Sequence, residues 1–299
     1  GLGIALSFFA AVGAVYLIFP RVGMLLNFRQ RIFVGQEVVG VLSLKTQFWG
    51  ILTGAAFVLG LGMWDDRKNV PAALKLSLQV VAAYIAMDFG VRLSGISVPG
   101  GEYYGFPLLV SQFVTVLWLT GFMNTINLVD GLDGLAAGIC AIASGVFLVV
   151  AILQGQSQVV LFSKQMKLAG ILSAALCGAC VGFLWYNFFP AKVFMGDGGA
   201  LFLGYMLAAI TVIGTLKTTA LFSLVIPIVV VALPVMDVAL SIVRRFRNGK
   251  EIFEADKEHL HHQLLKQGWN QREVVLLVYV ITLVLSIFSI LLTVFKGRV

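Results

Sequence analysis

The class of this protein is set by residues 107–153, PLLVSQFVTVLWLTGFMNTINLVDGLDGLAAGICAIASGVFLVVAIL. Two apolar runs, 107–123 and 135–153, flank a connection that carries Asn127, Asp130 and Asp133. About 20 apolar residues in a helix cross the hydrocarbon core of a bilayer. The stretch therefore predicts two membrane-spanning helices joined by an acidic connection.

The composition of the whole chain agrees with this prediction. Of its 299 residues 60% are hydrophobic, and only 21 are Lys or Arg and 14 Asp or Glu, which excludes a soluble globular or disordered protein. Three cysteines form no even disulfide framework, and the basic residues are too scattered for a nucleic-acid-binding face. We expect an all-α, polytopic membrane bundle that forms a single domain over residues 1–299.

The hydrophobic pattern predicts about ten crossings. Nine apolar runs are long enough to cross, and they are 1–19, 48–63, 72–91, 107–123, 135–153, 168–186, 200–214, 219–243 and 274–295. The stretch 32–44 is ambiguous, because 13 residues that include Glu37 suffice only for a short or re-entrant crossing.

Counting 32–44 as a crossing places five connections on one side of the membrane, namely 20–31, 64–71, 124–134, 187–199 and 244–273. With Lys75, that side holds 14 of the 21 basic residues, so the positive-inside rule makes it cytoplasmic. Both termini would then lie outside. The longest cytoplasmic connection, 244–273, would close the active site.

Acidic residues cluster on the same predicted face, at the ends of the apolar runs. They are Asp65, Asp66, Asp130, Asp133, Asp197 and Asp237. Adjacent carboxylates such as Asp65 and Asp66 repel each other unless a cation or a proton intervenes. With Arg67 and Lys68 beside them, a solvated helix end is the simpler alternative.

Asn127, Asp130 and Asp133 are spaced three residues apart, so on a helix they project from neighbouring positions of one side. Gly131 and Gly134 would let a ligand or another backbone approach them. The alternative is a polar loop that caps the following helix.

The segment FMGDGGA places Asp197 in a glycine-rich turn before an apolar run, beside the free N–H groups of a helix start. This pattern suits a magnesium–phosphate pair, because Mg²⁺ takes a few hard oxygen ligands and shares its shell with substrate phosphates. Asp197 and an amide such as Asn187 would suffice. A plain Gly-Asp turn is the alternative.

The connection 244–273 holds all three histidines of the chain, His259, His261 and His262. HxHH without a nearby cysteine is a weak zinc pattern. Because Arg244 and Arg245 are close in sequence, an anionic substrate is the more economical partner, and a solvated amphipathic helix is the alternative.

The motifs DDRKN, NLVDGLDGLA, YNFFPAKVFMGDGG, PVMD and DKEHLHH follow one another in the order and spacing of one family over roughly residues 48–273. The sequence resembles the polyprenyl-phosphate N-acetylhexosamine-1-phosphate transferases. Its HLHH segment is similar to that of the bacterial undecaprenyl-phosphate N-acetylglucosamine-1-phosphate transferases. NFRQRIFVGQEVVGVLSLK lacks the basic-histidine-proline stretch that family members usually carry after the first span.

The resemblance implies transfer of N-acetylglucosamine-1-phosphate, or a related HexNAc-1-phosphate, from a UDP-sugar to undecaprenyl phosphate, with release of UMP. It implies Mg²⁺, with Mn²⁺ as a substitute, in a multi-pass protein of the bacterial inner membrane whose active site faces the cytoplasm. This would be the first membrane step of cell-envelope polysaccharide assembly.

The resemblance also implies a role for each matching residue. Asp197 and Asn187 would hold the metal, and Asp65 and Asp66 would activate or position the lipid phosphate. Asn127, Asp130 and Asp133 would line the nucleotide pocket. Phosphate or sugar would be contacted by Arg244, Arg245, His259, His261 and His262.

An ion-coupled transporter is the main alternative class, since it also places carboxylates in a helical bundle. An aromatic prenyltransferase would space its acids four apart, and a CDP-alcohol phosphotransferase would need an arginine that DGLAAG lacks. The sugar, the choice between direct attack and a covalent aspartyl intermediate, and a homodimeric state are left open.

Overall fold

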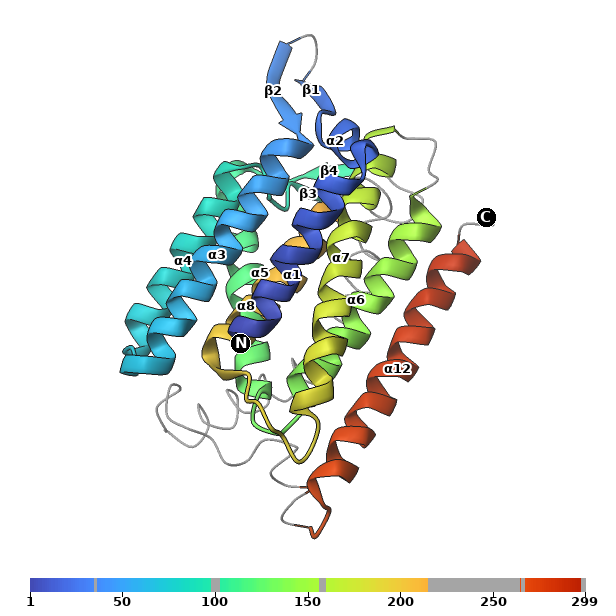
Figure 1. Ribbon diagram of the computed structural model, residues 1–299. Helices are drawn as coiled ribbons and strands as arrows, with labels where there is room; N and C mark the ends of the chain where they lie inside the picture. Colours follow the sequence, from blue (N-terminus) through green and yellow to red (C-terminus); the bar gives the residue numbers. More distant parts are fainter. Residues whose placement is uncertain (35–36, 98–102, 156–159, 215–263, 265–266, 297–299) are drawn as a thin grey trace.

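The computed structural model describes residues 1–34, 37–97, 103–155, 160–214, 264 and 267–296, and Figure 1 shows them as a bundle of long helices. The helices are α1 (Leu2–Ile18), α2 (Pro20–Leu26), α3 (Leu44–Lys68), α4 (Ala72–Asp88), α5 (Leu108–Val129), α6 (Leu135–Gln154), α7 (Val160–Asn187), α8 (Gly196–Gly214) and α12 (Gln271–Lys296). The strands are β1 (Arg29–Val34), β2 (Glu37–Ser43), β3 (Gly95–Ser97) and β4 (Tyr103–Gly105).

Six helices of the described part are long and apolar enough to cross a membrane: α3, α5, α6, α7, α8 and α12. Taking α1 and α2, which meet at 98°, as one broken span raises the number to seven. The multi-pass prediction is confirmed. The count of about ten crossings is not confirmed, because it included 32–44 and because the predicted run 219–243 lies outside the described residues.

Helix α8 forms the centre of the bundle. It packs against α3, α5 and α7, and every residue from Gly198 to Ile213 is buried. A helix that is apolar on all sides is buried among other helices or spans a membrane, and α8 is surrounded by other helices. This placement carries Asp197, in the first turn of α8, to the place where other helices end.

The prediction that 32–44 crosses the membrane is wrong. Strands β1 and β2 pair in antiparallel fashion from Arg29↔Ser43 to Val34↔Glu37 and form a hairpin. The residues favour strands, because β-branched Ile32, Val34 and Val41 fit a pleated sheet. A second short hairpin joins β3 and β4, so the chain is predominantly rather than entirely helical.

The hairpin also corrects the expected topology. Figure 1 places α2 and the β1–β2 hairpin at one end of the bundle, opposite the end where α3 finishes and α8 begins. Gly1 packs at that second end, since a Cβ built on it would lie 2.5 Å from Cα of Gly199. The sequence predicted 20–31 at the end with the acidic connections and the beginning of α1 at the other end. The structure shows the reverse for both segments.

This correction weakens the charge argument for orientation. Arg21, Arg29 and Arg31 lie at the end opposite the acidic residues. The excess of basic residues at the acidic end is therefore smaller than the sequence predicted and no longer indicates which end is cytoplasmic. The connections 64–71, 124–134 and 187–199 do meet at one end, as predicted.

Candidate functional site

Four helix ends meet at this end of the bundle and supply the candidate site. They are the C-terminal ends of α3 and α5 and the N-terminal ends of α4 and α8, which pack as the pairs α3–α8, α5–α8, α3–α4 and α4–α5. The sequence separates Asp65 from Asp197 by more than a hundred residues. The antiparallel packing of the helices brings them together.

Lys75, in the first turn of α4, is the centre of the site. Its Nζ lies 2.6 Å from Oδ2 of Asp65 and 2.9 Å from Oδ2 of Asp197, and donates to Oδ1 of Asn127 at 3.2 Å. A lysine ammonium has three N–H donors, so these contacts use all of them. The amine thus offsets the charge of two carboxylates from different helices.

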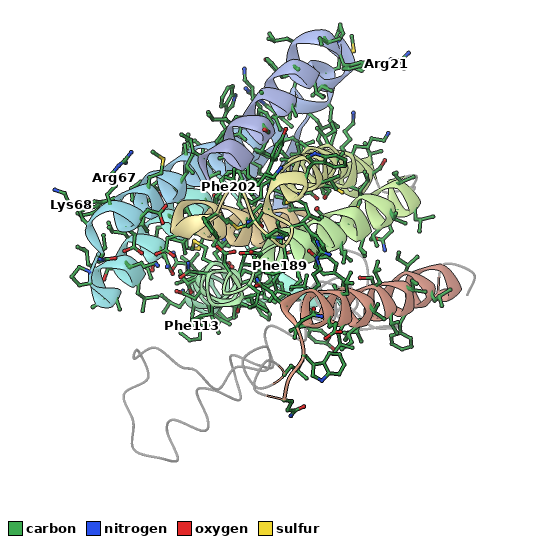
Figure 2. The ribbon with its side chains drawn as sticks, turned by 60° about the horizontal axis from the view of Figure 1, so that its bottom comes forward. Arg21, Arg67, Lys68, Phe113, Phe189 and Phe202 are labelled. Atoms are coloured by element: carbon green, nitrogen blue, oxygen red, sulfur yellow. The ribbon has the colours of Figure 1, made fainter. Side chains whose placement is uncertain are left out.

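The basic residues adjacent to the aspartate pair do not have this role. Figure 2 shows Arg67 and Lys68 projecting outward from the end of α3, away from the bundle. Arg67 contacts only the carbonyl oxygen of Met63 among the hydrogen bonds within the described residues, at 3.5 Å. The cation that faces Asp65 comes instead from the next helix.

Asp66 connects α3 to the start of α8. Its Oδ1 accepts a hydrogen bond from N–H of Asp197 at 2.7 Å, and its Oδ2 accepts one from N–H of Gly198 at 3.2 Å. The first N–H groups of a helix have no partner within the helix, and a carboxylate there is also favoured by the helix dipole. Asp66 therefore caps α8 from a neighbouring helix and fixes the backbone that carries Asp197.

The amide of Asn127 completes the environment of Asp197. Its Nδ2 donates to Oδ1 of Asp197 at 2.6 Å, while its Oδ1 accepts from Lys75. One turn further into each helix, Gln79 of α4 and Asn124 of α5 exchange hydrogen bonds of 3.3 and 2.6 Å. Two successive polar contacts thus hold α4 against α5 beneath the carboxylates.

Asp130, just after α5, senses the other acids of the site. Burial raises its pKa to about 7. The amino group of Gly1 opposes the rise, and the charges of Asp197, Asp66 and Asp133 add to it. The acids therefore lie close enough to interact electrostatically, and Asp130 binds a proton up to near neutral pH.

Asp133 and Asn187 have different surroundings from the rest. Oδ2 of Asp133 accepts a hydrogen bond from N–H of Ala191 at 3.0 Å. Oδ1 of Asn187 accepts from N–H of Gly134 at 3.1 Å, and its Nδ2 donates to the carbonyl oxygen of Val193 at 2.8 Å. Both side chains thus join the connection 130–134 to the connection 188–193, and the metal role of Asn187 stays a prediction that these contacts do not favour.

The remaining predicted site residues are Arg244, Arg245, His259, His261, His262 and Asp237, all outside the described residues. The closing role of 244–273 likewise stays a prediction. The structure adds Lys75, Gln79 and Asn124, which sequence analysis did not assign to the site. The sequence did offer one signal for them: Lys75 and Gln79 lie one turn apart in the apolar run 72–91. Polar residues in a membrane helix indicate polar partners on neighbouring helices.

Comparison with known proteins identifies the family of the chain. Residues 48–215 match the model of glycosyl transferase family 4. The chain is 37% identical, over 92% of its length and 74% of the relative's, to a probable undecaprenyl-phosphate N-acetylglucosaminyl 1-phosphate transferase of Bacillus subtilis. It is 40% identical to a decaprenyl-phosphate N-acetylglucosaminephosphotransferase of Mycobacterium leprae, over 77% of this chain and 60% of that protein.

A phospho-N-acetylmuramoyl-pentapeptide-transferase of Desulforudis audaxviator is 36% identical over 77% of this chain and 65% of its own length. The apolar helices and these relatives together identify a multi-pass membrane transferase of phosphosugars. The chain belongs to glycosyl transferase family 4. The resemblance inferred from the motifs is confirmed, and the transporter alternative finds no support among these relatives.

Proposed function

We propose that the chain transfers N-acetylglucosamine-1-phosphate, or a related HexNAc-1-phosphate, from a UDP-sugar to undecaprenyl phosphate. An oxygen of the lipid phosphate bonds to the β-phosphorus of the UDP-sugar, and the bond from that phosphorus to the oxygen bridging to UMP breaks. The products are polyprenyl-pyrophosphoryl-sugar and UMP. The names of the relatives support both the lipid acceptor and the amino sugar.

The observation that carries the proposal is the cluster of Asp65, Asp66, Asn127 and Asp197 around Lys75 at one end of a membrane bundle. Two phosphate esters repel each other as they react, so their site must supply fixed positive charge. A lipid acceptor must also reach that site from the bilayer. The cluster lies at the ends of spanning helices, which meets the second need. Its carboxylates outnumber the one lysine, so they would meet the first need by holding a divalent cation.

We propose Mg²⁺ as the cofactor, with Mn²⁺ as a substitute, and the support is two carboxylates that share one cation. Oδ2 of Asp65 and Oδ2 of Asp197 both contact the Lys75 ammonium, so hard oxygens from two helices already surround one cation. Asp197, with Asp65 beside it, would hold the ion. The ion would neutralise charge on the transferring phosphates.

The protein residues have distinct roles in this scheme. Lys75 keeps Asp65 and Asp197 at a fixed separation and adds one positive charge beside the site of the phosphates. Asp66 orients Asp197 by capping α8. Asp130 and Asp133 line the nucleotide pocket, and Arg244, Arg245 and the three histidines contact phosphate or sugar.

The contacts of the aspartate pair support direct attack by the lipid phosphate. Oδ1 of Asp65 accepts from N–H of Val70 at 2.7 Å while its Oδ2 contacts Lys75, and both oxygens of Asp66 accept backbone N–H groups. Carboxylates held in this way suit positioning better than nucleophilic attack. A covalent intermediate would exchange labelled UMP into the UDP-sugar without lipid acceptor, whereas direct attack predicts no exchange.

The proposed location is the inner membrane, with the site at the cytoplasmic face, where nucleotide sugars are made. The family resemblance supports this orientation. A homodimer is a further prediction from the resemblance.

The decisive experiment is an assay of the purified protein with polyprenyl phosphate and a panel of UDP-sugars, with UMP release as the measurement. We expect release that requires both substrates and stops when EDTA removes divalent ions.

Asp197→Asn should reduce release by about 100-fold or more, because it removes a charge that the site is built around. Exposed Asp88, at the far end of α4, supplies the control variant Asp88→Asn. Full activity of Asp197→Asn, or release unaffected by EDTA, would contradict the metal assignment.

A further inference from the structure

The two connections that carry Asp133 and Asn187 are bonded to each other. N–H of Gly134 donates to Oδ1 of Asn187, and N–H of Ala191 donates to Oδ2 of Asp133. The connections 130–134 and 188–193 therefore restrain each other at the end of the bundle that holds the candidate site.

Helix α12 contacts both connections independently. The hydroxyl of Tyr279 donates to the carbonyl oxygen of Gly134 at 2.5 Å. Nη2 and Nε of Arg272 donate to the carbonyl oxygen of Phe189 at 3.1 and 3.3 Å, and the guanidinium lies 5.8 Å from the centre of the Phe189 ring. Figure 2 shows Phe189 beside α12.

These contacts form a closed circuit. It runs from Tyr279 to Gly134, through Asn187 to Phe189, and back to α12 at Arg272. The peptide groups on both sides of Gly134 are fixed, since its N–H bonds to Asn187 and its carbonyl oxygen accepts from both Tyr279 and N–H of Gly138.

The packing around Tyr279 is specific to this contact. A Cβ on Gly138 would lie 2.0 Å from Cζ of Tyr279, so the missing side chain leaves the space that the phenol ring occupies. Because α6 accommodates the ring there, the hydroxyl reaches the first residues of the helix.

We infer that Tyr279 and Arg272 are positioning residues for the donor substrate, holding the Asp130–Gly134 connection in the conformation that receives the nucleotide. The inference rests on the proposed function for the identity of that substrate. Tyr279 bonds to the residue that directly follows Asp133, whereas the Lys75 cluster is held by α3, α4, α5 and α8 without α12. Loss of the Tyr279 hydroxyl should therefore weaken use of the UDP-sugar and leave use of the lipid phosphate unchanged.

The test compares Tyr279→Phe with Thr282→Val in the full chain in detergent. Both variants remove one hydroxyl from the buried side of α12, but that of Thr282 has no hydrogen-bond partner among the described residues. We expect Tyr279→Phe to raise KM for the UDP-sugar about threefold to tenfold, the range that one hydrogen bond gives. KM for polyprenyl phosphate should not change, and Thr282→Val should match the wild type for both substrates.

Arg272 supplies the second arm. Arg272→Lys keeps a donor for the Phe189 carbonyl and should retain most of the donor affinity that Arg272→Met loses. Combining Tyr279→Phe with Arg272→Met should cost less than the product of the single effects, because both break one circuit. Independent, multiplicative effects would show that the two connections are held separately and would overturn the inference.

Amide hydrogen exchange of residues 130–134 and 187–193 gives a readout that needs no turnover. We expect faster exchange in Tyr279→Phe than in Thr282→Val. Unchanged exchange, or equal changes in KM for both substrates, would overturn the positioning role. A wild type that releases no UMP would contradict the proposed function, and the exchange result would still decide the inference.

Discussion

The ammonium of Lys75 is the residue-scale feature on which the site depends. It is largely shielded, with 15% of its side chain exposed, and it faces Asp65, whose side chain is 7% exposed. A nearly buried carboxylate without its cation is strongly destabilising. The same contact therefore serves both the fold and the proposed reaction.

Lys75→Met tests this dual role. It keeps most of the side-chain volume and removes the charge, so we expect UMP release to fall by about 100-fold or more, together with a lower melting temperature. The control is Lys68→Met, because Lys68 is exposed and points outward. It should change neither UMP release nor the melting temperature. Near-wild-type turnover of Lys75→Met would show that the lysine is only structural.

The raised pKa of Asp130 makes a prediction about pH. The folded state holds a proton on this carboxyl up to about pH 7, whereas the ordinary value is 3.8. Between these values the folded state binds more protons than the unfolded state, so the free energy of unfolding falls as pH rises. Asp130→Asn should therefore melt above the wild type at pH 8 and close to it at pH 4.

Melting curves across this pH range check the prediction, with Asp88→Asn as the control for loss of one exposed carboxylate. An advantage of Asp130→Asn that is the same at pH 4 and pH 8 would contradict it. The expected gain at pH 8, paired with lost activity, would indicate a carboxyl kept in place for function at the expense of stability.

At the scale of elements, the backbones of α3 and α8 nearly touch beside the carboxylates. A Cβ on Gly62 would lie 2.4 Å from Cα of Gly198 and 2.6 Å from the carbonyl oxygen of Asp197. Small residues permit such close helix packing in membranes. The approach allows Asp66 to reach the N–H groups at the start of α8.

Gly62→Ala should separate these two helices, because the obstructing atoms are backbone. We expect a loss of about 100-fold in turnover, the scale of a 1 Å misplacement of reacting groups. Gly60→Ala is the matched control, since a Cβ at Gly60 meets no atom within 4 Å. UMP release by the two variants measures the difference, and equal activities would show that the α3–α8 contact does not set the site geometry.

At the scale of the whole molecule, the bundle has two different ends. One carries the carboxylate cluster, and the other carries the hairpins and α2 (Figure 1). Because the hairpin moves Arg21, Arg29 and Arg31 to the second end, orientation in the membrane needs a direct measurement.

Cysteine labelling in intact cells supplies it, in a background without Cys140, Cys177 and Cys180. Gln267→Cys is exposed just before α12 at the end of the bundle that holds the site, and Asn27→Cys is exposed at the opposite end. We expect a membrane-impermeant thiol reagent to label Asn27→Cys from outside and Gln267→Cys only after the membrane is opened. The reverse pattern would overturn the cytoplasmic placement of the site.

The residues alone determined the membrane class, most of the helices and the acidic groups at their ends. Hydrophobic runs of about 20 residues are stable as helices that cross a bilayer. Their number and positions can therefore be predicted from the sequence alone. Motif chemistry likewise singles out Asp65, Asp66, Asn127 and Asp197, which the structure brings together.

Tertiary structure alone decided which end of the bundle each connection reaches and which cation faces the acids. A run of 13 residues is compatible with a short crossing or a hairpin, and the antiparallel pairing of β1 with β2 shows that it is a hairpin. Lys75, Tyr279 and Arg272 contact partners that are 10 to 145 residues away in the sequence. Such contacts depend on how helices pack against one another, which the periodicity of an individual helix does not specify.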